Sequence, residues 1–302
     1  MFIELEYLNN QITDDPKAFI EKCDNEYFDN IGKIANEIIL SKASKPVVLI
    51  SGPSGSGKTT SAHTLERILE KAGMQTHTLS IDNFFYPLTE QEKLLKKQNK
   101  INLEGTDRVD CELLNKTLND IINMKPVYMP VFDFKDSTRS FEKTPLVRKN
   151  GEVVIVEGTH ALNPDVITLP DSKTVRIYVS VRTRVKTEED LLIHPEYIRL
   201  LRRMIRDNIH RGRSFTETAG MYSKVQDGEN KYIMPYKFRS TYDIDTFIPY
   251  ELSIYRDLIF EGLKKEDMYH KVPELITLLD GATPLDKKYI TSDISLINEF
   301  LK

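Results

Sequence analysis

Residues 46–61 read Pro-Val-Val-Leu-Ile-Ser-Gly-Pro-Ser-Gly-Ser-Gly-Lys-Thr-Thr-Ser, and this stretch decides the fold. Its apolar start has the composition of a buried strand, and a helical pattern follows the motif Gly52-x-x-x-x-Gly57-Lys58-Thr59. Glycines let successive backbone N–H groups converge on phosphate oxygens, and the next helix adds the partial positive charge of its N-terminus. The sequence therefore predicts a P-loop that binds a nucleoside triphosphate.

Individual residues of this loop have predicted roles. Lys58 is expected to act catalytically by neutralising the β- and γ-phosphates, and the hydroxyl of Thr59 is expected to ligate Mg²⁺. ATP is the expected phosphoryl donor, and Mg²⁺ is the expected metal. The residues expected to contact ATP are Gly52, Pro53, Ser54, Gly55, Ser56, Gly57, Lys58, Thr59 and Thr60.

The composition is that of an ordinary globular chain. Of its 302 residues, 40% are hydrophobic and 29% charged, so it can bury a sizeable core. The net charge of -4 gives no basic footprint for nucleic acid, and no run approaches the ~18 apolar residues of a membrane span. Two cysteines without metal-like spacing indicate reduced thiols, and the N-terminus lacks secretion features. We expect a cytoplasmic protein that acts on a small molecule, without nucleic acid or membrane partners. A homo-oligomer stays open.

Strand-like and helix-like segments alternate along the chain, which predicts an α/β fold with a parallel sheet flanked by helices. The expected strands are Val47–Ser51, Thr76–Ile81, Val127–Val131, Val153–Glu157, Val175–Val181 and Ile244–Ile248. The expected helices include Thr59–Ala72, Cys111–Met124 and Pro195–Arg211.

The chain divides into three expected parts. Residues 1–44 lack strand signals and predict a helical N-terminal extension. Residues 45–250 form the P-loop core, with a helical lid at approximately 185–235. Residues 251–302 are helical again, and we expect their end to pack back onto the core.

A second motif narrows the class of nucleotide-binding protein. The apolar run Val153–Val156 ends in Glu157-Gly158, and such a strand presents its carboxylate toward Mg²⁺ beside the P-loop strand. A GTPase should carry Asp-x-x-Gly after the P-loop and Asn-Lys-x-Asp for guanine. Here Asp-x-x-Gly occurs only at residues 29–32, and residues 115–118 lack the final Asp. The pattern favours a small-molecule kinase.

At this point the chain resembles the uridine kinase and phosphoribulokinase family, over roughly residues 45–250. The segments that match follow the family's order. After the P-loop they are Leu79–Tyr86, Asn102–Asp110, Pro130–Phe134 with Thr138-Arg139, Val156–Gly158, and Arg202–Asp207 with Arg211–Arg213. Segments Gly228–Pro235 and Ser292–Leu301 resemble a bacterial nucleoside kinase subgroup.

The resemblance implies transfer of the ATP γ-phosphoryl group to the 5′-hydroxyl of uridine or a related nucleoside. It gives Asp82 the role of orienting the hydroxyl and accepting its proton, which suits a carboxylate at the end of the second strand. It places Arg206, Arg211 and Arg213 on the lid, with Arg206 and Arg211 expected to contact ATP and Arg206 and Arg213 expected to be catalytic. The implied acceptor contacts are Asp82, Tyr86, Glu104, Phe132, Phe134, Ser137, Arg139 and Arg203.

Two positions depart from the family's pattern. Glu104 stands where the family has Asp, and Ser137 stands where pyrimidine-specific members have His. These changes predict a relaxed base preference. Two alternatives stay open: a kinase of another alcohol, similar to phosphoribulokinase or pantothenate kinase, and a nucleotide-binding regulator without transfer activity. GTP as the donor also stays open.

Overall fold

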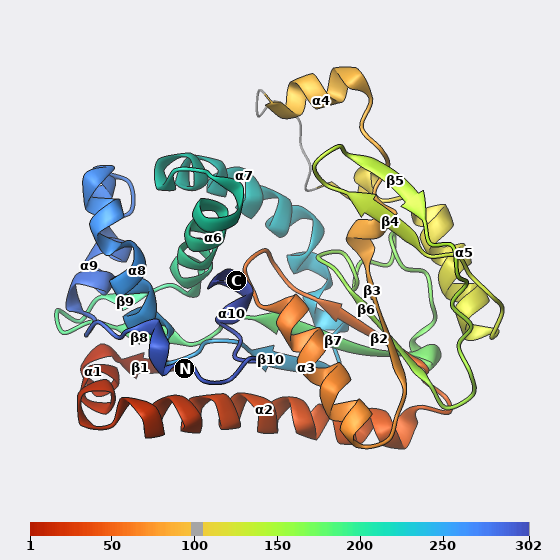
Figure 1. Ribbon diagram of the computed structural model, residues 1–302, viewed down its shortest axis with the longest axis horizontal. Coiled ribbons are helices and arrows are strands. Elements are labelled where there is room, and N and C mark those ends of the chain that lie inside the picture. The colour runs from red at the N-terminus through yellow and green to blue at the C-terminus, as the bar shows by residue number, and fades with distance from the viewer. Residues whose placement is uncertain (98–104, 302) are drawn as a thin grey trace.

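The computed structural model describes residues 1–97 and 105–301, and its centre is a five-stranded parallel sheet (Figure 1). The strand order is β10-β7-β2-β6-β3, and every neighbouring pair is parallel. The predicted α/β fold, a parallel sheet flanked by helices, is therefore confirmed. The strands are β2 (Val47–Ser51), β3 (Thr76–Ser80), β6 (Val153–Glu157), β7 (Thr174–Ser180) and β10 (Tyr242–Asp245).

Both faces of this sheet are buried. In β6, Val153 and Ile155 belong to one hydrophobic core, whereas Val154 and Val156 belong to the other. Successive strand residues point to opposite faces, so a strand covered on both sides becomes a continuous apolar run. That is why the sequence pattern identified the central strands.

Helices cover the two faces unequally. The helix α5 packs through Leu114 and Leu118 on one face, and the larger core on the other face takes side chains from α1, α2, α3, α6, α7, α8, α9 and α10. In the ranges 1–97 and 105–301, no helix is long and apolar enough to cross a membrane. The helices are α1 (Leu5–Asp14), α2 (Pro16–Ser41), α3 (Lys58–Lys71), α4 (Glu90–Lys97), α5 (Cys111–Ile122), α6 (Pro195–Arg211), α7 (Phe215–Tyr232), α8 (Glu251–Lys265), α9 (Pro273–Gly281) and α10 (Asn298–Leu301).

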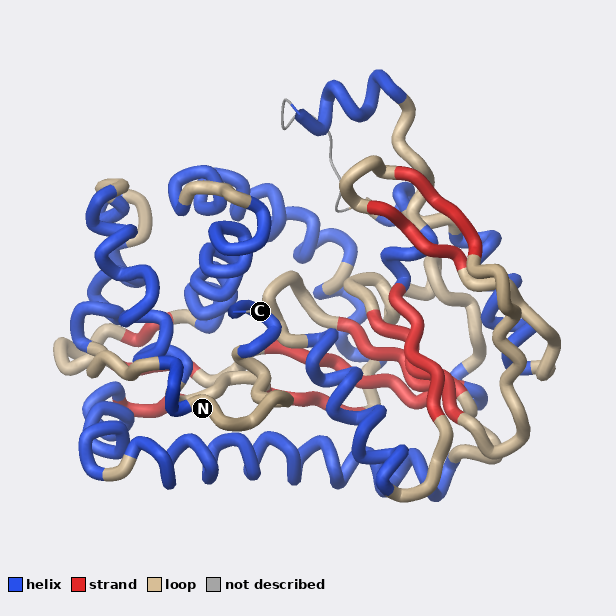
Figure 2. The backbone as a smooth tube through the Cα atoms, viewed as in Figure 1, coloured by secondary structure: helices blue, strands red, loops and turns tan. Residues whose placement is uncertain are grey.

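The expected strand Val127–Val131 is wrong. The structure places β4 (Pro130–Asp133) in an antiparallel hairpin with β5 (Thr138–Phe141), apart from the central sheet (Figure 2). Pro130 has no N–H group to donate to the hydrogen bonds of a central strand. Buried and exposed residues alternate along β4, which is typical of a hairpin with one face exposed to solvent. We call this hairpin together with α4 and the segment that leads into α4 (residues 85–97 and 130–141) the arm.

The N-terminal segment also differs from expectation, because it begins with a strand. β1 (Phe2–Glu4) pairs in parallel with β8 (Arg184–Lys186), which pairs antiparallel with β9 (Leu192–Ile193). Three residues are too few to show an alternating pattern. α1 and α2 follow, and Asp15 separates them by accepting a hydrogen bond from the N–H of Ala18.

The last sheet strand, β10, lies slightly before its expected position of Ile244–Ile248. It ends at Asp245 because that carboxylate accepts the N–H of Phe247 at 3.0 Å and turns the chain. The chain then runs through α8 and α9 and returns to the centre. Leu296, Ile297 and Phe300 are fully buried there, which confirms that the C-terminal end packs on the core.

Candidate active site

The P-loop joins β2 to α3 in the backbone conformation that its glycines predict. Gly55 and Gly57 have φ of 74° and 82°, in the left-handed region that favours glycine. A Cβ on Gly52 would lie 2.0 Å from the carbonyl oxygen of Val179 in β7. Only glycine fits there, so the loop lies directly against the sheet. The open backbone beside these glycines fits a chain of phosphates.

Ser54, in the middle of the loop, is held on three sides by α6 and α7. Its N–H donates to Oε1 of Glu229 at 3.0 Å, and its carbonyl accepts from Arg199 at 3.2 Å. Its hydroxyl accepts from the guanidinium of Arg203. Arg199 also pairs with Glu229 at 2.7 Å, and both are buried. Arg203, expected to contact the acceptor, therefore contacts the phosphate loop.

A second set of contacts satisfies the loop's carbonyl groups. Arg202 donates to the carbonyl of Gly55 at 3.1 Å and to that of Thr246 at 2.6 Å. The hydroxyl of Thr246 donates to the carbonyl of Ser56 at 2.7 Å. Arg202 is paired with Glu251 through two hydrogen bonds of 2.7 and 2.9 Å. Because Arg202 and Thr246 bind the carbonyls of Gly55 and Ser56, the conformation of the loop is stabilised without a ligand.

The two predicted acidic residues lie at neighbouring strand ends. The last residue of β3, Ser80, is in register with Glu157 at the end of β6, and Asp82 follows in the next turn. A Cβ on Gly158 would lie 2.7 Å from Cβ of Ile81, so the Glu-Gly pair lets the two strand ends approach closely. Both carboxylates therefore lie at the edge of the sheet that carries the P-loop.

The donor set at this edge fits magnesium. Thr59 is exposed at the start of α3, and Glu157 ends β6, the strand that pairs with β2 ahead of the P-loop, so both oxygens are available at this edge. Within the described residues no group of three or more His, Cys, Asp or Glu could hold a metal ion. Mg²⁺ usually takes one or two protein oxygens and completes its shell with water and phosphate oxygens. The expected pair, Thr59 and Glu157, matches that preference. The ammonium of Lys58 lies across the loop, donating to the carbonyl of Pro53 at 3.1 Å.

An aromatic cluster of the arm is joined to the turn that carries Asp82. Phe85, Phe132 and Phe134 form an edge-to-face cluster with ring centroids 5.8, 6.4 and 5.2 Å apart. The backbone N–H of Phe132 donates to Asn83, which directly follows Asp82, at 3.2 Å. Phe134 is 55% exposed. The cluster thus offers an open aromatic surface, tied to the turn that carries Asp82.

Arg139 and Tyr86 lie side by side on the arm. The guanidinium of Arg139 is 5.9 Å from the ring centre of Tyr86 and pairs with Asp110 at 2.9 Å. Since Asp110 also caps α5 by accepting the N–H of Leu113, Arg139 is fixed to the core. Both residues lie on the same arm as the aromatic cluster.

Two other acceptor residues have different outcomes. Ser137 is only 2% exposed and has a φ of 54°, and its carbonyl accepts the N–H of Leu88 at 3.0 Å. It is therefore part of the tight turn of the hairpin. Glu104 lies outside the described residues.

The lid arginines gather around a carboxylate that the sequence interpretation did not single out. Arg206, Arg211 and Arg213 lie 3.0, 3.1 and 3.3 Å from the carboxylate of Asp207. Burial alone would raise the pKa of Asp207, but Arg206, Arg211 and Arg203 together outweigh it and lower that pKa. A buried anion thus holds three cations in one cluster. The sequence does contain a signal for this role, because Asp207 is an acidic residue within a run of arginines and lies four residues before Arg211.

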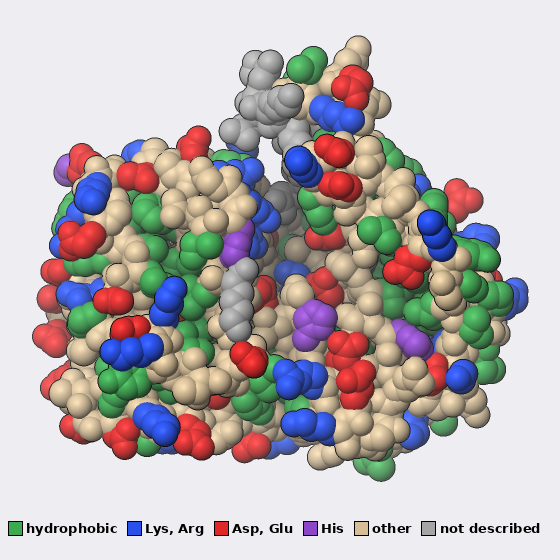
Figure 3. Space-filling model, in the orientation of Figure 1, with side chains coloured by type: hydrophobic (Ala, Val, Ile, Leu, Met, Phe, Trp, Pro, Cys, Tyr) green, Lys and Arg blue, Asp and Glu red, His purple; other side chains and the backbone are tan. Residues whose placement is uncertain are grey.

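Figure 3 shows where a substrate could enter. In this view a hollow separates the arm from the part of the molecule that carries α6 and α7, and both basic and acidic side chains lie around it. A phosphate loop, two carboxylates and an aromatic wall together form a constellation suited to phosphoryl transfer.

Comparisons with known proteins identify the family of the chain. Residues 47–247 match the Phosphoribulokinase / Uridine kinase family. The chain is 32% identical to a uridine kinase of Lactobacillus helveticus over 202 residues, covering 66% of this chain and 86% of that protein. It is 29% identical to uridine-cytidine kinase 2-B of Danio rerio over 194 residues, covering 62% and 68%.

Solved structures support the fold. The crystal structure of a putative fructose transport system kinase from Silicibacter sp. superposes with a TM-score of 0.51 at 15% identity. It covers 70% of this chain and 98% of that one. At this identity the similarity concerns the fold alone.

Proposed function

Because the chain belongs to the phosphoribulokinase / uridine kinase family, we propose that this P-loop small-molecule kinase transfers the γ-phosphoryl group of ATP to the 5′-hydroxyl of a nucleoside, with Mg²⁺. Uridine is the first candidate, since the similar proteins include a uridine kinase and a uridine-cytidine kinase. One observation carries the proposal. Asp82 and Glu157 lie at neighbouring strand ends beside the P-loop, and the aromatic cluster of the arm adjoins the turn that carries Asp82.

In the proposed reaction, Asp82 accepts the proton of the 5′-hydroxyl as that oxygen attacks the γ-phosphorus. A new O–P bond forms while the bond to the β-phosphate oxygen breaks, so the products are a nucleoside monophosphate and ADP. Mg²⁺, held by Thr59 and Glu157, would neutralise charge on the phosphate oxygens. Lys58 and the arginines Arg206 and Arg213 stabilise the charge that spreads over the transferring group.

The acceptor's base would stack on the aromatic cluster. Phe134 is the most exposed member of the cluster, and an exposed aromatic ring offers apolar surface for stacking. Ser137 is buried in its turn, so it gives the base no contact equivalent to an imidazole. A site that lacks one hydrogen-bonding partner discriminates less, by about 1–3 kcal/mol. We therefore propose a nucleoside kinase with a relaxed base preference.

Steady-state kinetics on uridine, cytidine, inosine and adenosine, with Mg·ATP as donor, tests the proposal. At least uridine should be phosphorylated, and the kcat/KM values of the four should lie within about two decades of each other. Ribulose 5-phosphate and pantothenate serve as comparison alcohols. If ribulose 5-phosphate or pantothenate is phosphorylated and none of the four nucleosides is, the acceptor is not a nucleoside. If ATP binds and no alcohol reacts, the chain is a regulator.

A further inference from the structure

The C-terminal tail, Ser292–Leu301, lies against the P-loop as a fixed segment. Its Leu296, Ile297 and Phe300 are fully buried. Ser295 and the hydroxyl of Tyr250 are 2.6 Å apart, and Tyr250 donates to the carboxylate of Asp24 in α2 at 2.6 Å. The tail is therefore anchored on α2 and on the segment that follows β10.

Two tail side chains pack on the groups that shape the loop. A Cβ on Gly57 would lie 2.9 Å from the side chain of Leu296. The ring of Phe300 lies 5.1 Å from the guanidinium of Arg202, which in turn binds the carbonyl of Gly55. The tail and the phosphate loop thus pack as one unit, and α10 lies beside the start of α3 (Figure 1).

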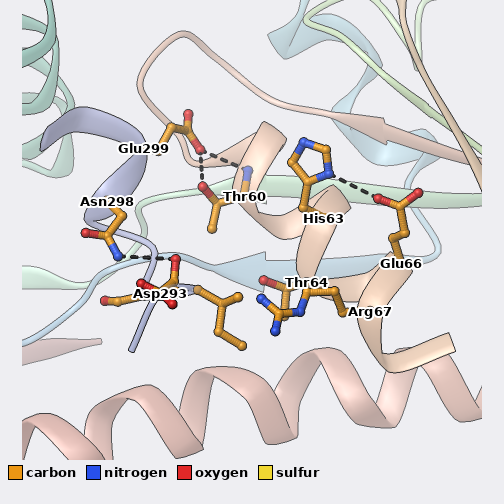
Figure 4. Close-up of a pocket in the computed structure, with 10 residues that line it drawn as sticks. Thr60, His63, Thr64, Glu66, Arg67, Asp293, Asn298 and Glu299 are labelled. Atoms are coloured by element: carbon orange, nitrogen blue, oxygen red, sulfur yellow. Dashed lines mark hydrogen bonds and ion pairs between the residues drawn. The ribbon is translucent and has the colours of Figure 1, made fainter. Parts of the chain in front are cut away.

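A third tail residue, Glu299, reaches a phosphate-binding position. One oxygen of its carboxylate accepts from both the N–H of Thr60 at 3.0 Å and the hydroxyl of Thr60 at 2.7 Å (Figure 4). α3 begins at Lys58, so the N–H of Thr60 is among the four donors at the helix start that have no partner within the helix. In a P-loop those donors bind phosphate. The carboxylate of Glu299 therefore occupies the N–H group of Thr60, a hydrogen-bond donor that could otherwise bind phosphate.

Glu299 also has room to leave this donor. It lines a cavity of about 420 Å³ between α3 and the tail, together with Thr60, His63, Thr64, Ser295 and Asn298. Because the cavity adjoins the carboxylate, the side chain can turn away from Thr60 while the anchored tail stays in place.

We infer that Glu299 lowers the affinity of the donor site for nucleotide, because its carboxylate competes with nucleotide phosphate for the N–H and hydroxyl of Thr60. The inference rests on the proposed ATP site. Like charges close together repel, so a bound nucleotide displaces Glu299 at a cost in affinity. This cost weakens the binding of ADP as well as ATP, and it favours release of ADP after transfer.

Calorimetric titration with Mg·ADP tests the inference in the full-length chain. Glu299→Gln keeps the size and one acceptor but removes the charge, so the Kd for ADP should fall about tenfold. The difference in Kd between Glu299→Gln and the wild type should become smaller at about 1 M salt, because the charge repulsion is then screened. Glu266→Gln is the matched control, since the carboxylate of Glu266 also accepts two hydrogen bonds at a helix start, in its case from the N–H groups of Phe215 and Thr216. Its Kd should equal that of the wild type.

A folded Glu299→Gln variant with an unchanged or higher Kd overturns the inference, because a purely structural carboxylate would weaken binding when neutralised. Thermal melting establishes folding. If Glu299→Gln does not fold, Glu299→Ala also removes the charge, and the same decrease in Kd is required of it. A wild-type protein that binds no ADP contradicts the proposed donor site itself. Wild-type binding without a gain in the variants contradicts only the role of Glu299.

Discussion

Arg202 and Glu251 form a bidentate ion pair behind the P-loop, with N···O distances of 2.7 and 2.9 Å and both side chains 0% exposed. The pair joins α6 to the start of α8. Since Arg202 also holds the carbonyl of Gly55, the pair positions the phosphate loop from inside the core.

Arg202→Met should destabilise the fold by about 3–5 kcal/mol, because Glu251 would remain buried without its partner. Urea unfolding of both proteins measures the loss. Glu261→Gln is the control, since it breaks the exposed pair of Glu261 with Lys264 and should leave the unfolding midpoint unchanged. A loss below about 1 kcal/mol for Arg202→Met would contradict the structural role of the pair.

The Asp207 cluster predicts a specific pH dependence of stability. Against the effect of burial, Arg206, Arg211 and Arg203 hold the pKa of Asp207 below its usual 3.8, so the ionised carboxylate stabilises the folded state at any pH above that unfolded value. The contribution is lost as the pH falls through the lower pKa of the folded state. The difference in unfolding free energy between the wild type and Asp207→Asn should therefore be constant from about pH 7 to 5 and shrink below about pH 4.

Urea titrations at a series of pH values measure this difference. A difference that grows as the pH falls below 4 would mean that Asp207 is stabilised in its protonated form. That outcome would remove the basis for placing the arginine cluster around an anion.

A feature of the fold or of the site could be predicted from the sequence where its residues are close together in the chain. The P-loop and the Glu157 strand were predictable because their residues are consecutive, and strands buried on both faces are apolar runs. The contacts that support the loop were not. Glu299 and Thr60 are 239 residues apart and Glu229 and Ser54 are 175 apart, so no local pattern joins them.

The arginines of α6 show the same limit. The resemblance placed Arg206, Arg211 and Arg213 on the lid, but the environment of each arginine depends on what packs there. Arg199, Arg202 and Arg203 proved buried against the P-loop, whereas Arg211 and Arg213 are partly exposed around Asp207. The hairpin was mispredicted for a related reason. An apolar run such as Val127–Val131 indicates a strand but not the sheet to which that strand belongs.

Asp82→Asn keeps the shape of the side chain but removes the proton acceptor. The kcat should fall by about two to four decades, with the Kd for ATP little changed. Asp14→Asn, at the end of α1, is the control and should behave like the wild type. If ATP affinity collapses while kcat survives, Asp82 acts on the metal or the fold and not on the acceptor.

Phe134→Ala tests the aromatic wall. Loss of the exposed ring should raise the KM for the nucleoside about tenfold, with a smaller effect on kcat and on the melting temperature. Phe238→Ala is a matched control, because Phe238 is 82% exposed on a different segment. Equal KM values for the wild type and Phe134→Ala would show that the base does not contact this cluster.

The central claim is that the P-loop of this chain delivers a phosphoryl group to a nucleoside. Phosphorus NMR of a mixture of enzyme, Mg·ATP and uridine tests it most directly, with Lys58→Ala as the matched variant. We expect uridine 5′-monophosphate and ADP in equal amounts from the wild type and neither from Lys58→Ala, because Lys58 neutralises the transferring group. Equal product from Lys58→Ala, or no nucleoside monophosphate from a wild type that phosphorylates another alcohol, would contradict it.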